Sequence, residues 1–283
     1  MKLVNTISEI KSIISLQKQK GTTIGFVPTM GALHEGHLSL VRRAKTECDI
    51  VVTSIFVNPS QFNDPNDLKK YPRTLESDLE LLEKEQCELV FAPTEMEISG
   101  SEKPDVSQYD FGPLESVMEG KFRPGHFKGV AYIVHSLFEI ITPDKAYFGE
   151  KDFQQLTIIH ELVKKYELPV EIIHCSTVRE SDGLAMSSRN INLSEEERKT
   201  ALLLSSSLYR AKDLSNSLSP LKVKDQIIKE LQSEIQLQLE YFDIVDSEKL
   251  NPINEWNESY HVRACISAYV GNTRLIDNMR LIP

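Results

Sequence analysis

The stretch "FVPTMGALHEGHLSLVRRA", residues 26–44, marks the point at which a buried strand gives way to a helix. Pro28 stops the apolar strand predicted at 22–29, and apolar residues at helical spacing follow from Leu38 to Ala44. The next segment, 49–57, is β-branched and apolar, as a central parallel strand should be. Strand, helix and strand within about thirty residues predict one βαβ unit.

Strands and helices continue to alternate after this unit. A helix at 7–21 precedes it. Further helices are predicted at 74–86, 127–141 and 151–166, and each is followed by a strand, at 87–93, 145–149 and 169–175 respectively. This alternation predicts an α/β fold with a doubly wound parallel sheet of the Rossmann-like kind, which binds ligands at the carboxyl ends of its strands. We assign residues 1–176 to this domain.

The pattern changes after Arg179. Ser194 and Glu197 form a capping-box pattern that opens a helix at 195–214. The segments that follow predict a helix at 221–239, a strand at 241–246 and a hairpin at 260–281 that turns at Gly271 and Asn272. Residues 177–283 therefore form a smaller α+β domain.

Composition places the chain among ordinary soluble proteins. Of its 283 residues, 40% are hydrophobic and 26% are charged, and the apolar runs are too short to span a membrane. The N-terminal residues lack the apolar region of a secretory signal. The cysteines lie far apart, which favours buried reduced thiols over structural metal: Cys48, Cys87, Cys175 and Cys265. These features predict a cytoplasmic protein.

The net charge of −10 argues against a general nucleic-acid-binding protein, which needs a basic face. An anionic substrate would have to be attracted by a local cluster of Lys and Arg, against the field of the whole chain.

His34 and His37 admit three interpretations. A metal site is disfavoured because the spacing differs from that of His-Glu-x-x-His, a glycine intervenes and no third ligand stands nearby. Two incidental histidines at a helix start are a second possibility. A phosphate site is favoured, because Thr29, Gly31 and Gly36 let backbone N–H groups approach an anion at the positive end of a helix. Imidazoles there can donate hydrogen bonds to phosphate oxygens.

Polar residues follow two other predicted strands. Pro59 presents Asn58 and Gln61 at a strand's carboxyl end, although an ordinary loop amide explains Gln61 equally well. Lys151 opens a predicted helix and can reach phosphate, and Asp152 beside it can bind a ribose hydroxyl or help to hold magnesium. A solvated ion pair is the alternative.

Further cations complete the local cluster that an anionic substrate demands. In "AMSSRN", the hydroxyls of Ser187 and Ser188 and the guanidinium of Arg189 suit a phosphate clamp. Arg123 in "FRPGH" adds another cation, for which an exposed loop arginine is the alternative. Gln155 stands four residues after Lys151, on the same face of the predicted helix.

Several of these motifs occur together in a known family. The chain resembles the pantoate–β-alanine ligases, a branch of the His-x-Gly-His nucleotidylyltransferase superfamily, through motifs in family order over nearly its whole length: "PTMGALHEGHLSLVRRA", "SIFVNPSQF", "DLKKYPRTLESDLE", "GKFRPGHFKGV", "PDKAYFGEKDFQQL" and "RESDGLAMSSRNINLSEEER". Small departures at His135, Ser136 and Asn192 lie outside the motifs assigned to catalysis and concern packing or subunit contacts.

The resemblance implies a function. ATP and magnesium would activate (R)-pantoate as pantoyl adenylate with release of pyrophosphate, and β-alanine would then displace AMP to give pantothenate, the precursor of coenzyme A. It implies a homodimer with small-molecule substrates and with neither nucleic acid nor membrane as partner. The C-terminal domain would act as a lid over the nucleotide.

Matching positions in the family supply the roles of individual residues. Catalysis falls to His34, His37, Lys151 and Arg189. The ATP site comprises Pro28, Thr29, Met30, Gly31, His34, Gly36, His37, Gly149, Glu150, Lys151, Asp152, Val178, Met186, Ser187, Ser188 and Arg189. Pantoate and β-alanine are assigned to Met30, Asn58, Gln61, Arg123 and Gln155, and no residue is assigned as a dedicated metal ligand.

Three rival functions share part of this pattern. A nucleotidyltransferase acting on a phosphate has no evident need for the "NPSQF" and "EKDFQQL" motifs. A class I tRNA synthetase would need an anticodon-binding extension and suits the acidity poorly. A nucleotide-binding regulator without catalysis would not need both histidines together with Lys151 and Arg189.

Overall fold

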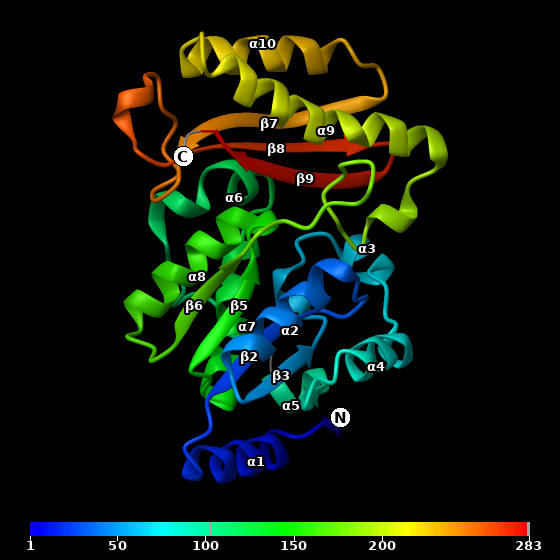
Figure 1. Ribbon diagram of the computed structural model, residues 1–283, viewed down its shortest axis with the longest axis vertical. Helices are drawn as coiled ribbons and strands as arrows, with labels where there is room; N and C mark the ends of the chain where they lie inside the picture. Colours follow the sequence, from blue (N-terminus) through cyan, green and yellow to red (C-terminus); the bar gives the residue numbers. More distant parts are fainter. Residues whose placement is uncertain (102–103, 282–283) are drawn as a thin grey trace. The chain divides into compact units, whose positions relative to one another are not determined.

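The computed structural model of the protein describes residues 1–101 and 104–281 (Figure 1). Within these residues, six parallel strands form one sheet. The strand order is β1-β4-β3-β2-β5-β6, and the strands are β1 (Lys2–Val4), β2 (Ile24–Thr29), β3 (Ile50–Ile55), β4 (Leu89–Phe91), β5 (Lys145–Gly149) and β6 (Glu171–Cys175). From β2 the chain builds β3 and β4 on one side, and β5 and β6 lie on the other. The predicted doubly wound sheet is confirmed, with its switch point between β2 and β5.

The ladder between β2 and β5 is short. These strands pair at Gly25 with Lys145 and at Phe26 with Ala146, whereas β2 pairs with β3 along its full length. The carboxyl ends of β2 and β5 extend beyond the paired positions. That edge of the sheet is where doubly wound proteins bind ligands.

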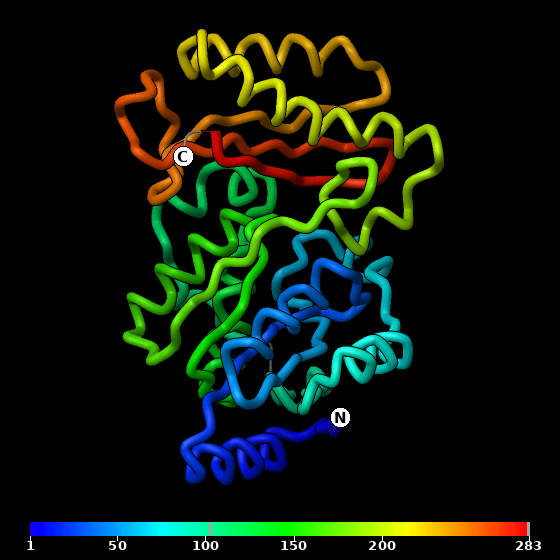
Figure 2. Tube along the Cα trace, in the orientation of Figure 1, coloured from blue at the N-terminus to red at the C-terminus, as the bar shows by residue number. Residues whose placement is uncertain are grey.

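The chain divides into two compact units. Figure 2 traces the Cα path, and its colours give the residue number along the chain. The first comprises Met1–Glu115, Arg123–Glu150 and Ile158–Ser176; the second comprises Ser116–Phe122, Lys151–Thr157 and Thr177–Pro283. Two short segments that precede residue 177 in sequence therefore pack with the C-terminal part of the chain.

Helix α2 (Glu35–Glu47) illustrates how the first unit forms its core. It begins after His34, and its apolar stripe packs with the neighbouring strand residues Val27 and Val51. The stripe consists of Leu38, Leu40, Val41 and Ala44, the helical spacing that the sequence predicted. The other helices that lie largely or wholly in this unit are α1 (Ile7–Gln19), α3 (Pro65–Lys70), α4 (Leu75–Lys84), α5 (Glu95–Ser99), α7 (His126–Ile141) and α8 (Phe153–Lys165).

In the second unit, an antiparallel sheet of order β7-β8-β9 carries two helices and a third short one. Apolar residues of the strands and of the two longer helices form one buried cluster. The elements are α6 (Met118–Phe122), α9 (Glu195–Leu214), α10 (Pro220–Gln232), β7 (Leu237–Asp246), β8 (Val262–Val270) and β9 (Thr273–Arg280).

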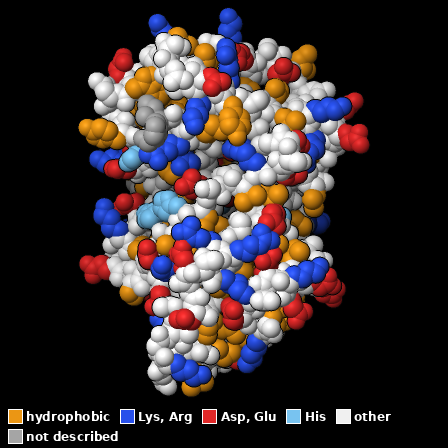
Figure 3. All heavy atoms as spheres, viewed as in Figure 1, with side chains coloured by type: hydrophobic (Ala, Val, Ile, Leu, Met, Phe, Trp, Pro, Cys, Tyr) orange, Lys and Arg blue, Asp and Glu red, His pale blue; other side chains and the backbone are white. Residues whose placement is uncertain are grey.

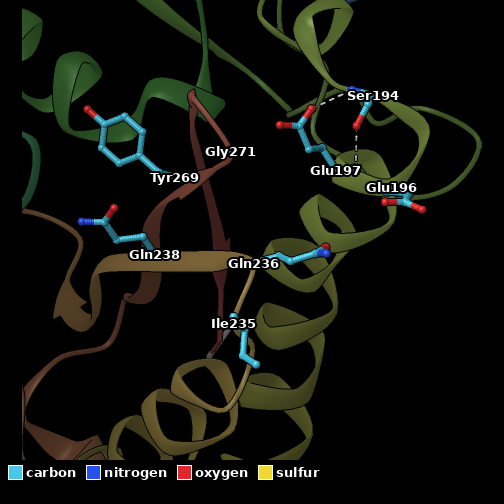
Figure 4. Close-up of a pocket in the computed structure, with 8 residues that line it drawn as sticks. All are labelled: Ser194, Glu196, Glu197, Ile235, Gln236, Gln238, Tyr269 and Gly271. Carbon is cyan, nitrogen blue, oxygen red and sulfur yellow. Dashed lines mark hydrogen bonds between the residues drawn. The ribbon is translucent and has the colours of Figure 1, made fainter.

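The predicted start of α9 and the predicted hairpin are both confirmed. Ser194 Oγ accepts from the Glu197 N–H at 3.3 Å, and the Glu197 carboxylate accepts from the Ser194 N–H at 2.8 Å (Figure 4). Gly271 opens the hairpin turn with a φ of +54°. A Cβ there would lie 1.8 Å from Glu197 Oε1, so glycine is required both by conformation and by space.

Several elements differ from the sequence prediction. The helix predicted at 221–239 ends at Gln232, and Leu237 begins a strand because it pairs with Val270 across the sheet. The helix predicted from 151 begins at Phe153, since Lys151 lies in a 3₁₀ turn. Strand β1 was not predicted; three residues are too few to show a period.

The four cysteines are free thiols, three of them buried and Cys48 half-buried. Burial raises the pKa of Cys175 to about 11 and the pKa of Cys265 to about 12. These thiols are therefore protonated and unreactive at neutral pH. Within the two described ranges, none of the helices is long and apolar enough to cross a membrane.

Helix α7 can approach the loop after β3 only because residue 129 is glycine. A Cβ at Gly129 would lie 2.2 Å from the carbonyl oxygen of Ser60. We expect Gly129→Ala to lower the free energy of unfolding by about 1–3 kcal/mol or more, because a backbone atom must move. Urea denaturation measures this change. Gly149→Ala is the control for stability, since no atom lies within 4 Å of the added methyl group and its φ is ordinary. Equal stability of the two variants would contradict the close approach.

Candidate active site

The two histidines form a stacked pair at the start of α2. His34 is the N-cap residue, and the ring centroids of His34 and His37 lie 4.1 Å apart with the rings tilted by 35°. His37 Nδ1 accepts a hydrogen bond from the His34 backbone N–H at 3.3 Å. In the neutral ring the proton must then reside on Nε2, which makes that atom a hydrogen-bond donor. Such a donor beside a helix N-terminus suits an anion.

A buried carboxylate shapes the loop that leads to these histidines. Asp78 on α4 is 1% exposed and accepts from the backbone N–H groups of Ala32 (2.9 Å) and Leu33 (2.8 Å). Gly31 and Ala32 have positive φ values of +77° and +50°. The loop takes this unusual path because its donors turn toward one carboxylate. Sequence reasoning missed Asp78; the available signal was a lone aspartate on the apolar face of an amphipathic helix.

Thr29, the last residue of β2, is hydrogen-bonded both to the neighbouring strand β3 and to the loop that follows it in the chain. Its hydroxyl donates to the Ser54 carbonyl at 2.6 Å and accepts from the Gly31 N–H at 3.2 Å. The side chain is 8% exposed. Thr29 and Gly31 therefore act together in turning the chain from β2 toward the histidine pair.

Met30, Asn58 and Gln61, predicted to contact pantoate, lie together in the first unit. Gln61 Nε2 is 2.9 Å from Met30 Sδ, and Gln61 Oε1 accepts from Asn58 Nδ2 at 3.2 Å. Asn58 also donates to the Gly129 carbonyl at 3.0 Å and accepts from the Ser60 hydroxyl at 2.8 Å. Asn58 is thus occupied in holding Gln61 and the adjoining turn.

Arg123 joins this group through a histidine that sequence reasoning did not single out. His126 is 6% exposed; its Nδ1 lies 2.7 Å from the Gln61 carbonyl oxygen and its Nε2 lies 3.1 Å from Arg123 Nη1. A carbonyl can only accept, so Nδ1 carries the proton and Nε2 accepts from the guanidinium. The motif "FRPGH" contained the signal, an arginine and a histidine three residues apart at a helix start.

Lys151, Asp152 and Gln155 lie in the second unit, at the junction of the 3₁₀ turn Glu150–Asp152 and α8. Lys151 Nζ is 3.7 Å from Asp152 Oδ1, and the Lys151 side chain is 19% exposed. Lys151 precedes the α-helix, so α-helical spacing does not place Gln155 on the same face as Lys151, contrary to the sequence prediction. Gly149, the last residue of β5, and Glu150, the first residue of the turn, belong to the first unit.

The "AMSSRN" motif ends a loop in the second unit that is hydrogen-bonded to itself. The Met186 N–H donates to the Val178 carbonyl at 3.0 Å, and the Arg189 N–H donates to Ser187 Oγ at 3.3 Å. Asn190 is buried and donates to the Ala185 carbonyl and to Glu180. Ser187, Ser188 and Arg189 are partly exposed at the end of this loop.

Two surface hollows contain none of the residues assigned to ATP or pantoate. One has a volume of about 510 Å³ and carries the carboxylates of Glu196 and Glu197 (Figure 4). The other, about 480 Å³, lies beside Pro143 and Val170, which precede β5 and β6, at the amino-terminal edge of the sheet. Acidic and basic side chains are interspersed over the face shown in Figure 3. Across residues 1–101 and 104–281, no cluster of three or more His, Cys, Asp or Glu could hold a metal ion.

Known proteins resemble the chain over its whole length. The family model described as pantoate-beta-alanine ligase matches residues 2–280. The pantothenate synthetase of Phocaeicola vulgatus is 50% identical over 281 residues, 99% of each chain. The crystal structure of pantothenate synthetase from Thermus thermophilus has a TM-score of 0.92 at 39% identity and covers 100% of both chains. The ligase from Francisella tularensis, whose structure holds an ATP compound and β-alanine, has a TM-score of 0.79 at 36% identity, covering 99% of this chain and 98% of that one.

The role of Asp78 can be tested by an isosteric change. We expect Asp78→Asn to lower the free energy of unfolding by about 1–3 kcal/mol, because an amide N–H would face the backbone N–H groups of the loop. Chemical denaturation measures this. Asp49→Asn is the matched control: Asp49 also accepts two hydrogen bonds, from Thr23, but is exposed. A loss no greater than that of the control would show that the buried carboxylate does not hold the loop.

Proposed function

The chain belongs to the pantoate–β-alanine ligase family, and from this premise we propose how its residues bind and align the substrates. The reaction is the ATP-dependent formation of an amide bond between pantoate and β-alanine in pantothenate biosynthesis. ATP is the co-substrate.

The reaction proceeds in two steps through an acyl adenylate. The carboxylate of pantoate attacks the α-phosphorus of ATP, and pyrophosphate leaves. The amine of β-alanine then attacks the acyl carbon, and AMP leaves. Neither step needs a covalent bond to the enzyme, so catalysis rests on alignment of the reactants and on stabilisation of charge on the phosphoryl oxygens.

The geometry of the histidine pair is the observation that carries this proposal. His37 Nδ1 accepts from the His34 backbone N–H, so the proton of the neutral ring is on Nε2, and this Nε2–H would donate to the phosphates as pyrophosphate departs. A neutral donor of this kind strengthens its hydrogen bond as negative charge grows on the leaving oxygen. Pro28, Thr29, Gly31 and Gly36 would bring backbone groups close to the nucleotide.

The second unit contributes charge to the same nucleotide. Lys151 and Arg189 would bind the phosphates, with Ser187 and Ser188 donating from their hydroxyls. Gly149, Glu150, Asp152, Val178 and Met186 would line the adenosine side. Residues 177–283 would act as the lid that delivers the "AMSSR" segment.

Pantoate would lie against the group around Gln61. The Gln61 amide would bind the hydroxyl groups of pantoate together with Gln155, and Met30 would contact its methyl groups. Arg123, oriented by His126, would attract a substrate carboxylate. Asn58 would act through Gln61, since its own donors and acceptors are engaged.

Magnesium would enter with ATP, neutralising charge on the phosphates. Magnesium takes oxygen ligands and keeps several waters, so a single carboxylate is sufficient on the protein side. Asp152, whose side chain is 48% exposed beside Lys151, is the carboxylate that fits. We further propose a cytoplasmic homodimer; light scattering of the purified protein measures its mass in solution.

Exchange of labelled pyrophosphate into ATP tests the first step. With magnesium and pantoate present and β-alanine omitted, we expect exchange that depends on pantoate, because formation of the adenylate is reversible. A folded protein that binds ATP without exchange would contradict the proposed intermediate.

The roles of Lys151 and His37 are tested in the same assay. We expect Lys151→Ala and His37→Gln each to reduce the exchange rate by about 10²-fold or more, because each removes a donor to the developing charge. Lys164→Ala is the control, since the Lys164 side chain is 78% exposed on α8. Near-normal exchange in a folded Lys151→Ala variant would defeat its assignment.

A further inference from the structure

Asn278 on β9 holds the backbone of Lys151. Asn278 is 5% exposed, and its Nδ2 donates to the Lys151 carbonyl oxygen at 2.8 Å. Its Oδ1 accepts from Arg263 Nη1, which fixes the orientation of the amide. The Arg263 guanidinium carbon lies 3.9 Å from the centre of the Phe153 ring, two residues after Lys151. The turn that carries Lys151 is therefore attached to the antiparallel sheet at two points.

Asp277, the preceding residue, holds the base of the loop that ends in the "AMSSR" segment. Asp277 is 3% exposed and accepts two hydrogen bonds from Arg179, at 2.7 Å and 3.0 Å. Burial lowers the pKa of Arg179, but the hydrogen bond and the charge of Asp277 outweigh burial and raise the pKa overall. Arg179 also donates to the Gly183 carbonyl at 3.1 Å and pairs with Ala185 in a β-bridge. This bidentate pair thus fixes both arms of the loop.

Adjacent residues of one strand consequently anchor two segments that are far apart in sequence. The Cα atoms of neighbouring residues are about 3.8 Å apart and their side chains leave opposite faces of a strand. A further hydrogen bond, from the Asn278 N–H to Asp277 Oδ1 at 2.7 Å, links the two anchors. Neighbouring residues of β9 therefore hold both the backbone of Lys151 and the loop that precedes Ser187. This fixes the two segments relative to each other within the second unit.

We propose that Asp277 and Asn278 are positioning residues for catalysis, which set Lys151 and the Ser187–Arg189 segment at a fixed separation. This inference rests on the proposed role of Lys151 and Arg189 in binding the phosphates. A lysine has a flexible stem, so the origin of its backbone decides which oxygen its ammonium group reaches. A displacement of about 1 Å in a group that aligns reactants can cost about 10²-fold in rate.

Asn278→Asp provides the sharpest test, because it removes the donor to the Lys151 carbonyl and keeps an acceptor for Arg263. We expect kcat for pantoate-dependent pyrophosphate exchange to fall by about 10-fold or more, while KM for pantoate changes little. In a Lys151→Ala background the same substitution should cause no further loss, since the side chain that Asn278 positions is already gone. If Asn278→Asp does not fold, Asn278→Ala is measured in its place, both in the otherwise unchanged chain and in the Lys151→Ala background.

Asp277→Asn tests the other anchor in the same way. It weakens the pair with Arg179, and we expect a loss of exchange in the otherwise unchanged chain. We expect no further loss in a background that carries Ser187→Ala, Ser188→Ala and Arg189→Ala together, because the side chains that Asp277 positions are then gone. Ser267→Ala is the matched control: Ser267 is fully buried in β8 and donates to Glu240 at 2.9 Å. It should lower thermal stability but leave kcat per folded molecule unchanged.

Each outcome has one meaning. A near-normal rate in Asn278→Asp, or a loss that multiplies with that of Lys151→Ala, would overturn the positioning role of Asn278. The corresponding results for Asp277→Asn, alone and in the background that carries Ser187→Ala, Ser188→Ala and Arg189→Ala, would overturn that of Asp277. Normal exchange in Lys151→Ala alone would instead refute the proposed function of that lysine, so the two failures are distinguishable.

Discussion

The short ladder between β2 and β5 is the constraint on which the site in the first unit depends. On one side of β2 the sheet continues with β3 and β4, and on the other side with β5 and β6. At such a reversal of strand order, the segments that follow the two adjacent strands leave toward opposite faces of the sheet. Beyond Phe26 and Ala146 the two strands no longer pair, and β2 continues to Thr29 before it turns into the loop that leads to His34. The topology of the sheet therefore fixes where β2 ends, and the loop held by Asp78 leads from that point to the histidine pair.

Buried polar side chains convert this placement into a defined geometry. Asp78, Asn58 and Asn278 each hold backbone or side-chain groups of residues that we assign to the substrates or that lead to them. A buried carboxylate or amide is stable only when its hydrogen bonds are made, so each of these side chains permits one arrangement of the chain around it. The groups that contact substrate and the groups that position them are thus different residues.

The same separation applies to the cations. Arg274 lies between the carboxylates of Glu119 and Glu240, at 2.7 Å from each, and burial together with these partners commits it to the second unit's interior. Arg179 is committed to Asp277 in the same manner. A chain with a net charge of −10 therefore uses part of its positive charge for structure. The attraction of an anionic substrate falls to a few local cations and to oriented N–H groups.

Local sequence alone determined the elements with long periodic patterns and the residues within short motifs. The bounds predicted for α9 and β5 agree with the structure to the residue, and the helix start at His34 was also predicted. The short motifs identified the family and, through it, the substrates. Only the tertiary structure decided the end of α10, where pairing of Leu237 with Val270 overrides helical spacing, and the roles of Asp78, His126, Asp277 and Asn278. Those residues act on partners 45 to 127 positions away in the chain. Local periodicity records which face of an element is buried, but it does not record which distant group meets that face.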